Sequence, residues 1–153
     1  MAPHAAPSRE QPTASTDLEA GRELKLGEFA DVETLSLSEA RIVLQRTLEM
    51  RQKRGEPFDE SDTMVKTRDY LEIFAVFKDL SVAEQVEQLI NSLGNDLVKF
   101  EKSQLKSLLP TCADEAKALI PSLEKKVEDG VLDEMQLDEI CKEVQRLKRQ
   151  AEL

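Results

Sequence analysis

The stretch from Phe100 to Leu123 constrains the fold most strongly, because two prolines divide it into short segments of helical pattern. Apolar residues recur at helical spacing up to Pro110, which has no backbone N–H with which to continue a helix. Thr111 offers a hydroxyl to cap the next helix, and Pro121 stops that helix in turn. A short helix between two prolines is typical of the centre of a compact helical domain. The predicted buried faces of the two helices comprise Phe100, Leu105, Leu108, Leu109, Ala116, Leu119 and Ile120.

Helical patterns also occupy the chain on both sides of this stretch. One helix is expected from Thr63 to about Asp79. Ser81 and Glu84 have the spacing of a capping box and predict the start of the next helix. The last helix is expected over about residues 132–151, with the inward residues Leu137, Ile140, Cys141, Val144 and Leu147. The sequence therefore predicts an all-α fold, a bundle of about five helices over residues 63–153.

The N-terminal part of the chain has a different composition. Residues 1–20 contain three prolines among alanine, serine and threonine. They offer too little apolar surface to offset the entropy of ordering, so we predict a disordered tail. Residues 21–54 are predicted to form an arm followed by a first helix. Within the arm, Leu24–Phe29 alternates too briefly for an independent strand, so it either needs a sheet edge from elsewhere or lies as a loop across its own core.

The first helix is expected to begin at a serine cap, either Ser36 or Ser38. Ile42 and Val43 give this helix a second apolar side. A helix that is apolar on more than one side is normally buried on more than one side, either by a partner or by other helices of the same chain. Residues 55–62, which contain glycine, proline and four acidic residues, are predicted to be a linker.

The side chains that enzymes use for acid–base and nucleophilic chemistry are scarce. The single histidine is His4, in the predicted tail. Five scattered glycines form neither a P-loop nor a dinucleotide-binding turn. Cys112 and Cys141 are too far apart in the sequence for a zinc motif, and we expect both to be reduced thiols. Aligning Gly130 with the glycine of an EF-hand loop leaves most ligand positions without a carboxylate. We predict no enzyme activity, no catalytic residue, no cofactor and no metal site.

The formal net charge of −10 makes the chain a poor autonomous binder of DNA or RNA, because nucleic-acid binding proteins neutralise phosphates with clustered lysine and arginine. One tyrosine, five phenylalanines and no tryptophan leave little for stacking on bases. Composition therefore favours protein partners, or a basic partner subunit that binds the nucleic acid. No apolar run approaches the roughly 18 residues of a membrane span, so we expect no membrane partner.

The segment FEKSQLKSLLP and the later run EAKALIPSL together resemble a known family pattern. They are similar to the fourth subunits of eukaryotic RNA polymerase II, a resemblance that extends over about residues 24–150. The equivalent stalk subunit of RNA polymerase III is an alternative, and the run Ala-Leu-Ile-Pro-Ser-Leu favours polymerase II. The positions that match the pattern are Phe100, Glu101, Leu105, Leu108, Pro110 and Glu115 through Leu123.

This resemblance implies a non-catalytic subunit that forms a heterodimer with the seventh subunit of RNA polymerase II. In the family, the pair is the stalk beside the RNA exit channel, and it contacts the polymerase core through the seventh subunit. The implied role is support of transcription initiation and handling of nascent RNA, in the nucleus and also in the cytoplasm. The implied fold of the bundle is that of HRDC domains, the C-terminal domains of helicases and RNase D.

In the family, the arm and first helix engage the partner, which would also bind most of the nascent RNA. The expected partner-binding residues are Leu24, Leu26, Phe29, Val32, Leu35, Leu37, Leu44 and Leu48. Lys99, Lys102 and Lys106 share one side of a predicted helix and are candidates for weak RNA contact. Two alternatives remain open. One is an independent HRDC-type nucleic-acid-binding module, and the other is a scaffold that acts away from polymerase through the same arm.

Overall fold

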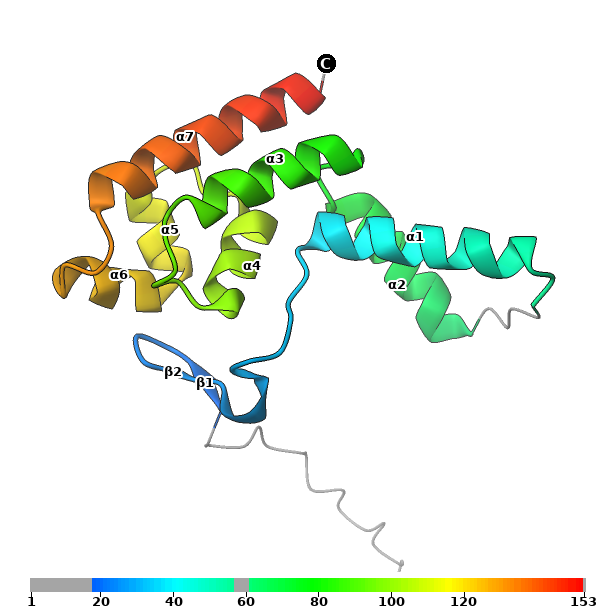
Figure 1. Ribbon diagram of the computed structural model, residues 1–153, viewed down its shortest axis with the longest axis horizontal. Helices are drawn as coiled ribbons and strands as arrows, with labels where there is room; N and C mark the ends of the chain where they lie inside the picture. Colours follow the sequence, from blue (N-terminus) through cyan, green and yellow to red (C-terminus); the bar gives the residue numbers. More distant parts are fainter. Residues whose placement is uncertain (1–17, 57–60, 153) are drawn as a thin grey trace, which may run out of the picture.

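The computed structural model describes residues 18–56 and 61–152 (Figure 1). These residues contain seven α-helices, a 3-10 turn and a two-stranded hairpin, so the predicted all-α fold is confirmed. The elements are β1 (Glu19–Ala20), β2 (Leu24–Lys25), the 3-10 turn η1 (Gly27–Phe29), α1 (Leu37–Lys53), α2 (Asp62–Phe74), α3 (Leu80–Asn91), α4 (Lys99–Leu108), α5 (Ala113–Leu119), α6 (Pro121–Glu128) and α7 (Glu134–Ala151).

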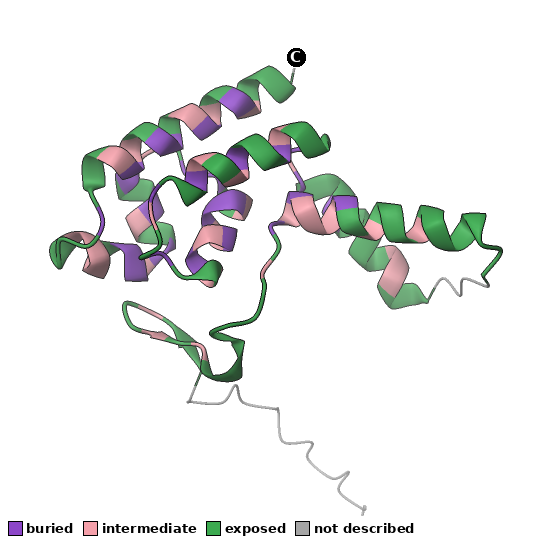
Figure 2. Ribbon diagram, in the orientation of Figure 1, coloured by how far each residue is buried: buried purple, intermediate pink, exposed green. Residues whose placement is uncertain are grey.

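Helices α3 to α7 form the bundle and carry most of the buried positions (Figure 2). The side chains of its core are mainly aliphatic. Leu105, Leu123 and Leu137 are almost completely buried there. The five residues predicted to face inward from the last helix are all buried, which confirms the sequence pattern for α7. Because the apolar stripes of several helices meet here, the bundle has a continuous core within this one chain.

Both proline breaks lie where the sequence predicts them. Helix α4 ends at Leu108, and Leu109 takes a left-handed conformation with φ of 50° before Pro110. Pro121 ends α5 and also occupies the first position of α6, where a missing N–H breaks no helical hydrogen bond. From the sequence Pro121 was expected only to end a helix, so α6 is a helix that was not predicted.

Two leucines of the predicted buried faces are exposed. Leu108 and Leu119 are the last residues of α4 and α5, and nearly half of each side chain remains accessible. The chain changes direction directly after each of them, so the neighbouring helix covers the earlier turns and not the last one. Periodicity alone does not show where along a helix its covering neighbour stops.

The helix caps agree with the sequence in one case and differ in two. Ser36 caps α1 and forms a capping box with Glu39. Ser81 and Glu84 do not form one, because α3 begins earlier and its N-cap is Asp79. Thr111 does not cap α5 either, since its hydroxyl and its backbone N–H both donate to Glu115.

Helix α2 is shorter than predicted and packs in a different place. It ends at Phe74 rather than near Asp79. Phe77 lies beyond it, buried in the core of the bundle, where its backbone N–H donates to the hydroxyl of Ser38 at 3.1 Å. The helix itself packs mainly against α1, and the two extend from the bundle as a pair (Figure 1). The sequence assigned this segment to the bundle of residues 63–153, whereas its main contact is with the first helix.

The extended segment of the arm pairs with a strand of its own chain and not with a sheet edge of another protein. β2 pairs with β1 in an antiparallel hairpin, in which Ala20 lies opposite Leu24. Only Leu24–Lys25 of the expected extended segment is a strand, because the chain turns into η1 at Gly27. The described end of the predicted tail contributes β1. The rest of that tail, and residues 57–60 of the predicted linker, lie outside the described residues.

Candidate partner-binding surface

The arm leaves three large apolar side chains in contact with solvent. Phe29, Val32 and Leu35 are 62%, 49% and 54% exposed, and we call these three residues the arm surface. A neighbouring cleft of about 370 Å³ is lined by Leu26, Phe29 and Phe100, where the arm passes beside α4. These three exposed apolar side chains lie within seven residues of the sequence, and a contiguous exposed apolar surface is typical of a site that another molecule covers.

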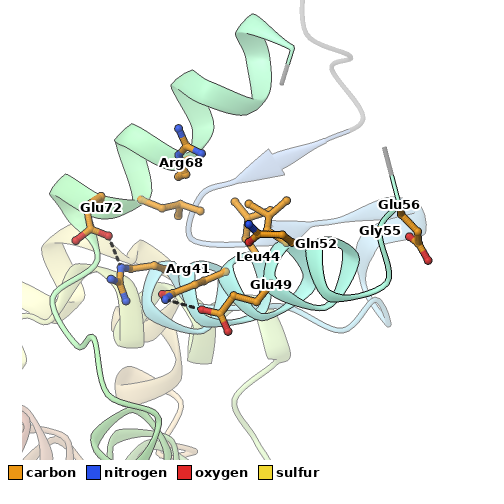
Figure 3. Close-up of a pocket in the computed structure, with 11 residues that line it drawn as sticks. Arg41, Leu44, Glu49, Gln52, Gly55, Glu56, Arg68 and Glu72 are labelled. Carbon is orange, nitrogen blue, oxygen red and sulfur yellow. Dashed lines mark hydrogen bonds and ion pairs between the residues drawn. The ribbon is translucent and has the colours of Figure 1, made fainter. Parts of the chain in front are cut away.

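A second candidate surface is the groove between α1 and α2, which encloses about 540 Å³ (Figure 3). Its apolar lining comes from Leu44 and Leu48 of α1 and from Leu71 of α2. Apart from Gly55, the rest of the lining is polar or charged and comprises Arg41, Gln45, Glu49, Gln52, Glu56, Arg68 and Glu72. An apolar groove with a charged rim is suited to receiving an apolar side chain or helix of a partner.

An ion pair joins the two helices of this groove near the bundle (Figure 3). Arg41 donates to the carboxylate of Glu72 at 2.6 Å, and Lys78 donates to the other oxygen of that carboxylate at 2.7 Å. The hydrogen bonds from Arg41 and then Lys78 lower the pKa of Glu72 to about 2. The carboxylate therefore stays charged well below its ordinary pKa of 4.5 and links α1 to α2 through Arg41.

The structure places the eight expected interface residues in different environments. Leu44 and Leu48 are half-buried in the groove, whereas the arm surface is freely accessible. Leu24, Leu26 and Leu37 are also half-buried, each already partly covered by this chain. The eight residues thus differ in how far this chain already covers them, and their role in binding stays a prediction.

The second apolar side of the first helix, formed by Ile42 and Val43, is covered only in part by this chain. Ile42 is buried in the core of the bundle together with Phe77 and residues of α3 and α4. Val43, next to it in the sequence, is half exposed. The chain itself therefore covers one of these two residues, and only Val43 remains available to a partner.

Sequence reasoning missed an apolar stripe on α2. Tyr70, Ile73 and Phe74 are each more than half exposed, and the rings of Tyr70 and Phe74 lie 4.6 Å apart in a tilted arrangement. Their spacing of three and four residues is visible in the sequence and is typical of one side of a helix, but spacing does not show which side of that helix is covered. Only the packing of α2 on α1 shows that Leu71 is covered while these neighbours are not.

The three lysines proposed for RNA contact are not a free basic face. Lys106 is buried and donates to both carboxylate oxygens of Glu39, at 2.8 and 3.0 Å. Burial raises the pKa of Glu39, but the hydrogen bonds from Lys106 and Ser36 outweigh it, so the pKa lies below the ordinary value. Lys99 is paired with Glu33 of the arm. Lys102, which lies between these two lysines in the sequence and is half-buried, is the remaining candidate for RNA contact.

Within residues 18–56 and 61–152, no three His, Cys, Asp or Glu side chains gather to hold a metal ion. The thiol of Cys141 is buried, and desolvation raises its pKa to about 11, so it is a poor nucleophile. None of the described helices combines the length and the apolar character that a bilayer crossing requires.

Comparison with known proteins gives consistent results. The family model described as RNA polymerase Rpb4 matches residues 34–148. The chain is 40% identical over 120 residues to "DNA-directed RNA polymerase II subunit rpb4" of Schizosaccharomyces pombe, a match covering 74% of this chain and 86% of that protein. It is 32% identical over 138 residues to the subunit of the same name from Dictyostelium discoideum, covering 78% and 84%.

The match to "DNA-directed RNA polymerase II subunit RPB4" of Saccharomyces cerevisiae is more local. It is 43% identical over 82 residues, which cover 54% of this chain and 34% of that longer protein. The family model covers most of the chain and includes the proline-bounded helices, α1 and α2. The chain therefore belongs to the RNA polymerase Rpb4 family.

Proposed function

We propose that the chain is a non-catalytic subunit of RNA polymerase II and that it forms a heterodimer with the seventh subunit of that enzyme. The pair would act as the stalk beside the RNA exit channel, supporting transcription initiation and the handling of nascent RNA. It would join the polymerase core through the seventh subunit, in the nucleus. The observation that carries this proposal is the arm surface, three apolar side chains that the chain itself leaves uncovered.

The locations of the arm surface and of the α1–α2 groove favour a protein as the partner. The arm surface belongs to the N-terminal part of the chain, and the α1–α2 groove presents Leu44 and Leu48. Both surfaces lie outside the bundle, whose own core is already closed. A partner that covers them would remove apolar area from water at little cost to the packing of this chain.

An independent nucleic-acid-binding module is the weaker alternative. The formal net charge is −10, and two of the three candidate RNA-contact lysines, Lys106 and Lys99, are paired with Glu39 and Glu33. Phosphate contacts need uncommitted cations, because binding gains its free energy from displaced counterions. The relatives are named as subunits of polymerase II, which favours that enzyme over polymerase III.

The first test is co-purification with the seventh subunit, followed by light scattering on a sizing column. We expect a 1:1 complex with the wild-type chain. Phe29→Asp should weaken association at least about 100-fold, because a charge replaces a central apolar contact. Met135→Asp is the matched control, since Met135 is 74% exposed on α7 and outside both candidate surfaces. A complex unaffected by Phe29→Asp would remove the arm surface from the interface.

Leu44→Asp tests the α1–α2 groove in the same assay. Circular dichroism of the isolated variant should show that the bundle remains helical, since Leu44 is not part of the bundle core. Loss of association with helicity retained places the groove in the interface. A wild-type chain that remains alone in the presence of the seventh subunit contradicts the proposed function as a whole.

A further inference from the structure

Opposite charges join the arm to α6 at the β1–β2 turn. The guanidinium of Arg22 lies 3.4 Å from Glu124 and 2.5 Å from Glu128. The next arm residue carries the opposite sign, and its carboxylate, on Glu23, accepts from Lys125 at 2.7 Å. The hydrogen bond to Lys125 lowers the pKa of Glu23, and the same bond raises the pKa of Lys125. Two adjacent arm residues of opposite charge, Arg22 and Glu23, thus each pair with residues of the opposite sign on α6.

A second contact fixes the other end of the arm to the start of α4. Lys99 pairs with Glu33 and donates to the backbone carbonyl of Asp31 at 3.2 Å. In return, the hydroxyl of Thr34 donates to the carbonyl oxygen of Lys99 at 2.9 Å. These bonds join segments 65 or more residues apart in the sequence, so they set tertiary position and not local structure.

The arm surface lies between and just beyond these two contacts. Phe29 follows the first contact and precedes the second, and it lines the cleft beside Phe100 without being covered by it. Val32 lies between the residues that bind Lys99, and it too is exposed. Apolar burial therefore contributes little to holding this part of the arm, and the polar contacts at its two ends determine where it lies.

We propose that these two polar contacts form a charge latch that holds the arm against α4 and α6 and so presents the arm surface to a partner. The latch comprises Arg22 with Glu124 and Glu128, Glu23 with Lys125, and Glu33 with Lys99. Its members are largely exposed, and exposed ion pairs are individually weak and screened by salt. The arm consequently exchanges between a docked and a released position, and the latch sets the balance.

Part of this inference rests on the proposed function, because presentation matters only if a partner binds the arm. The docked position itself is a property of the isolated chain. It is therefore tested first without a partner, by hydrogen exchange and mass spectrometry on peptides that cover residues 18–35, at 20 and 500 mM NaCl.

Arg22→Glu places a third negative charge beside Glu124 and Glu128, and we expect exchange in the arm to accelerate by about three- to tenfold at low salt. Glu23→Lys should have a similar effect by facing Lys125. The double variant Glu23→Lys with Lys125→Glu restores the pair in reverse and should recover most of the protection. Arg149→Glu, the same charge change at an exposed position near the end of α7, should leave the arm unchanged.

The decisive result is the recovery in the double variant. Faster exchange in both single variants together with recovery in the exchanged pair supports the latch. Unchanged exchange in both single variants, or a double variant as fast as the singles, overturns it. With the seventh subunit added, Arg22→Glu should weaken binding by about three- to tenfold, and less so at 500 mM NaCl. Failure of the wild-type chain to bind that subunit refutes the proposed function and leaves the exchange result standing.

Discussion

The bundle and the N-terminal part of the chain use their apolar residues in opposite ways. In α3 to α7 the large aliphatic side chains face one another, and Leu123 and Leu137 are fully buried. In the arm, Phe29 and Leu35 face solvent, and the segment is positioned by polar contacts. The bundle is thus stabilised by contacts within the chain, whereas the arm has apolar residues that its own chain does not cover. The difference separates a scaffold from a binding segment.

The α1–α2 pair is intermediate between these two regions. The first turns of α1 belong to the bundle through Ile42 and Ser38, whereas Leu44 and Leu48, further along, line an open groove. A single helix therefore passes from core to candidate interface within a few residues. Because one continuous helix contributes to both, the position of the groove is fixed relative to the bundle.

The largest expected effect distinguishes the bundle from the arm. Leu137→Ala should lower the free energy of unfolding by about 3 kcal/mol, because it leaves a cavity in a closed core. Leu35→Ala, an equal change in the arm, should cost less than about 0.5 kcal/mol. Urea denaturation followed by circular dichroism measures both. Equal losses would mean that the arm is packed as firmly as the bundle.

Glu101 tests whether the bundle also depends on a buried charge. Its fully buried carboxylate accepts from the hydroxyl of Ser122 at 2.6 Å, from Lys126 at 2.5 Å and from the N–H of Val98 at 2.9 Å. Glu101→Ala should destabilise the chain by about 3 kcal/mol, since three donors lose their acceptor together. Glu84→Ala, at an exposed position of α3, is the control and should cost about 0.5 kcal/mol or less. A loss of only about 0.5 kcal/mol for Glu101→Ala would contradict a dependence of the bundle on this buried carboxylate.

Ser38 tests the junction between the bundle and the α1–α2 pair. Ser38→Ala removes the acceptor of the buried N–H of Phe77 and should cost about 1–2 kcal/mol. Hydrogen exchange should accelerate mainly at residues 75–79, where the chain passes from α2 to the bundle. Ser81→Ala, at an exposed serine near the start of α3, should leave that exchange unchanged. Acceleration confined to the arm would contradict this role for Ser38.

The smallest expected effect is a pH dependence of the α1–α2 pair. Hydrogen bonds from Arg41 and Lys78 lower the pKa of Glu72 to about 2 in the folded chain, from an ordinary value of 4.5. A lowered folded-state pKa stabilises the fold above the unfolded pKa, and that stability is lost as the pH falls from about 4.5 to about 2. NMR of α2 amides should show loosening over that interval in the wild type. In Glu72→Gln this step should be absent, and its persistence would assign it to another carboxylate.

The sequence alone predicted the parts of the fold that local chemistry governs. The breaks at Pro110 and Pro121 follow from proline geometry, and the inward face of α7 follows from its periodicity. The serine cap at the start of α1 was also predictable, because Ser36 and Glu39 have the spacing of a capping box. Family resemblance came from the same proline-bounded stretch and agrees with the family match over residues 34–148.

Other features depended on contacts between distant segments. Periodicity gave α2 an apolar face, but only its packing against α1 separates buried Leu71 from exposed Ile73. Three lysines on one helix side suggested a basic face, and distant carboxylates of Glu33 and Glu39 pair with two of them. Sequence spacing describes one helix at a time, and it contains no information on which neighbour approaches or with which charge.

The sequence by itself thus determined the class of fold, the ends of most of its helices, and the family. Each of these follows from interactions between residues close together in the chain, such as capping, proline geometry and helical periodicity. The tertiary structure decided which apolar residues are core and which are surface, that α2 belongs with α1, and that the arm is held by charge. These depend on loop closure and side-chain packing between segments up to 106 residues apart, as for Arg22 and Glu128, which local patterns do not specify.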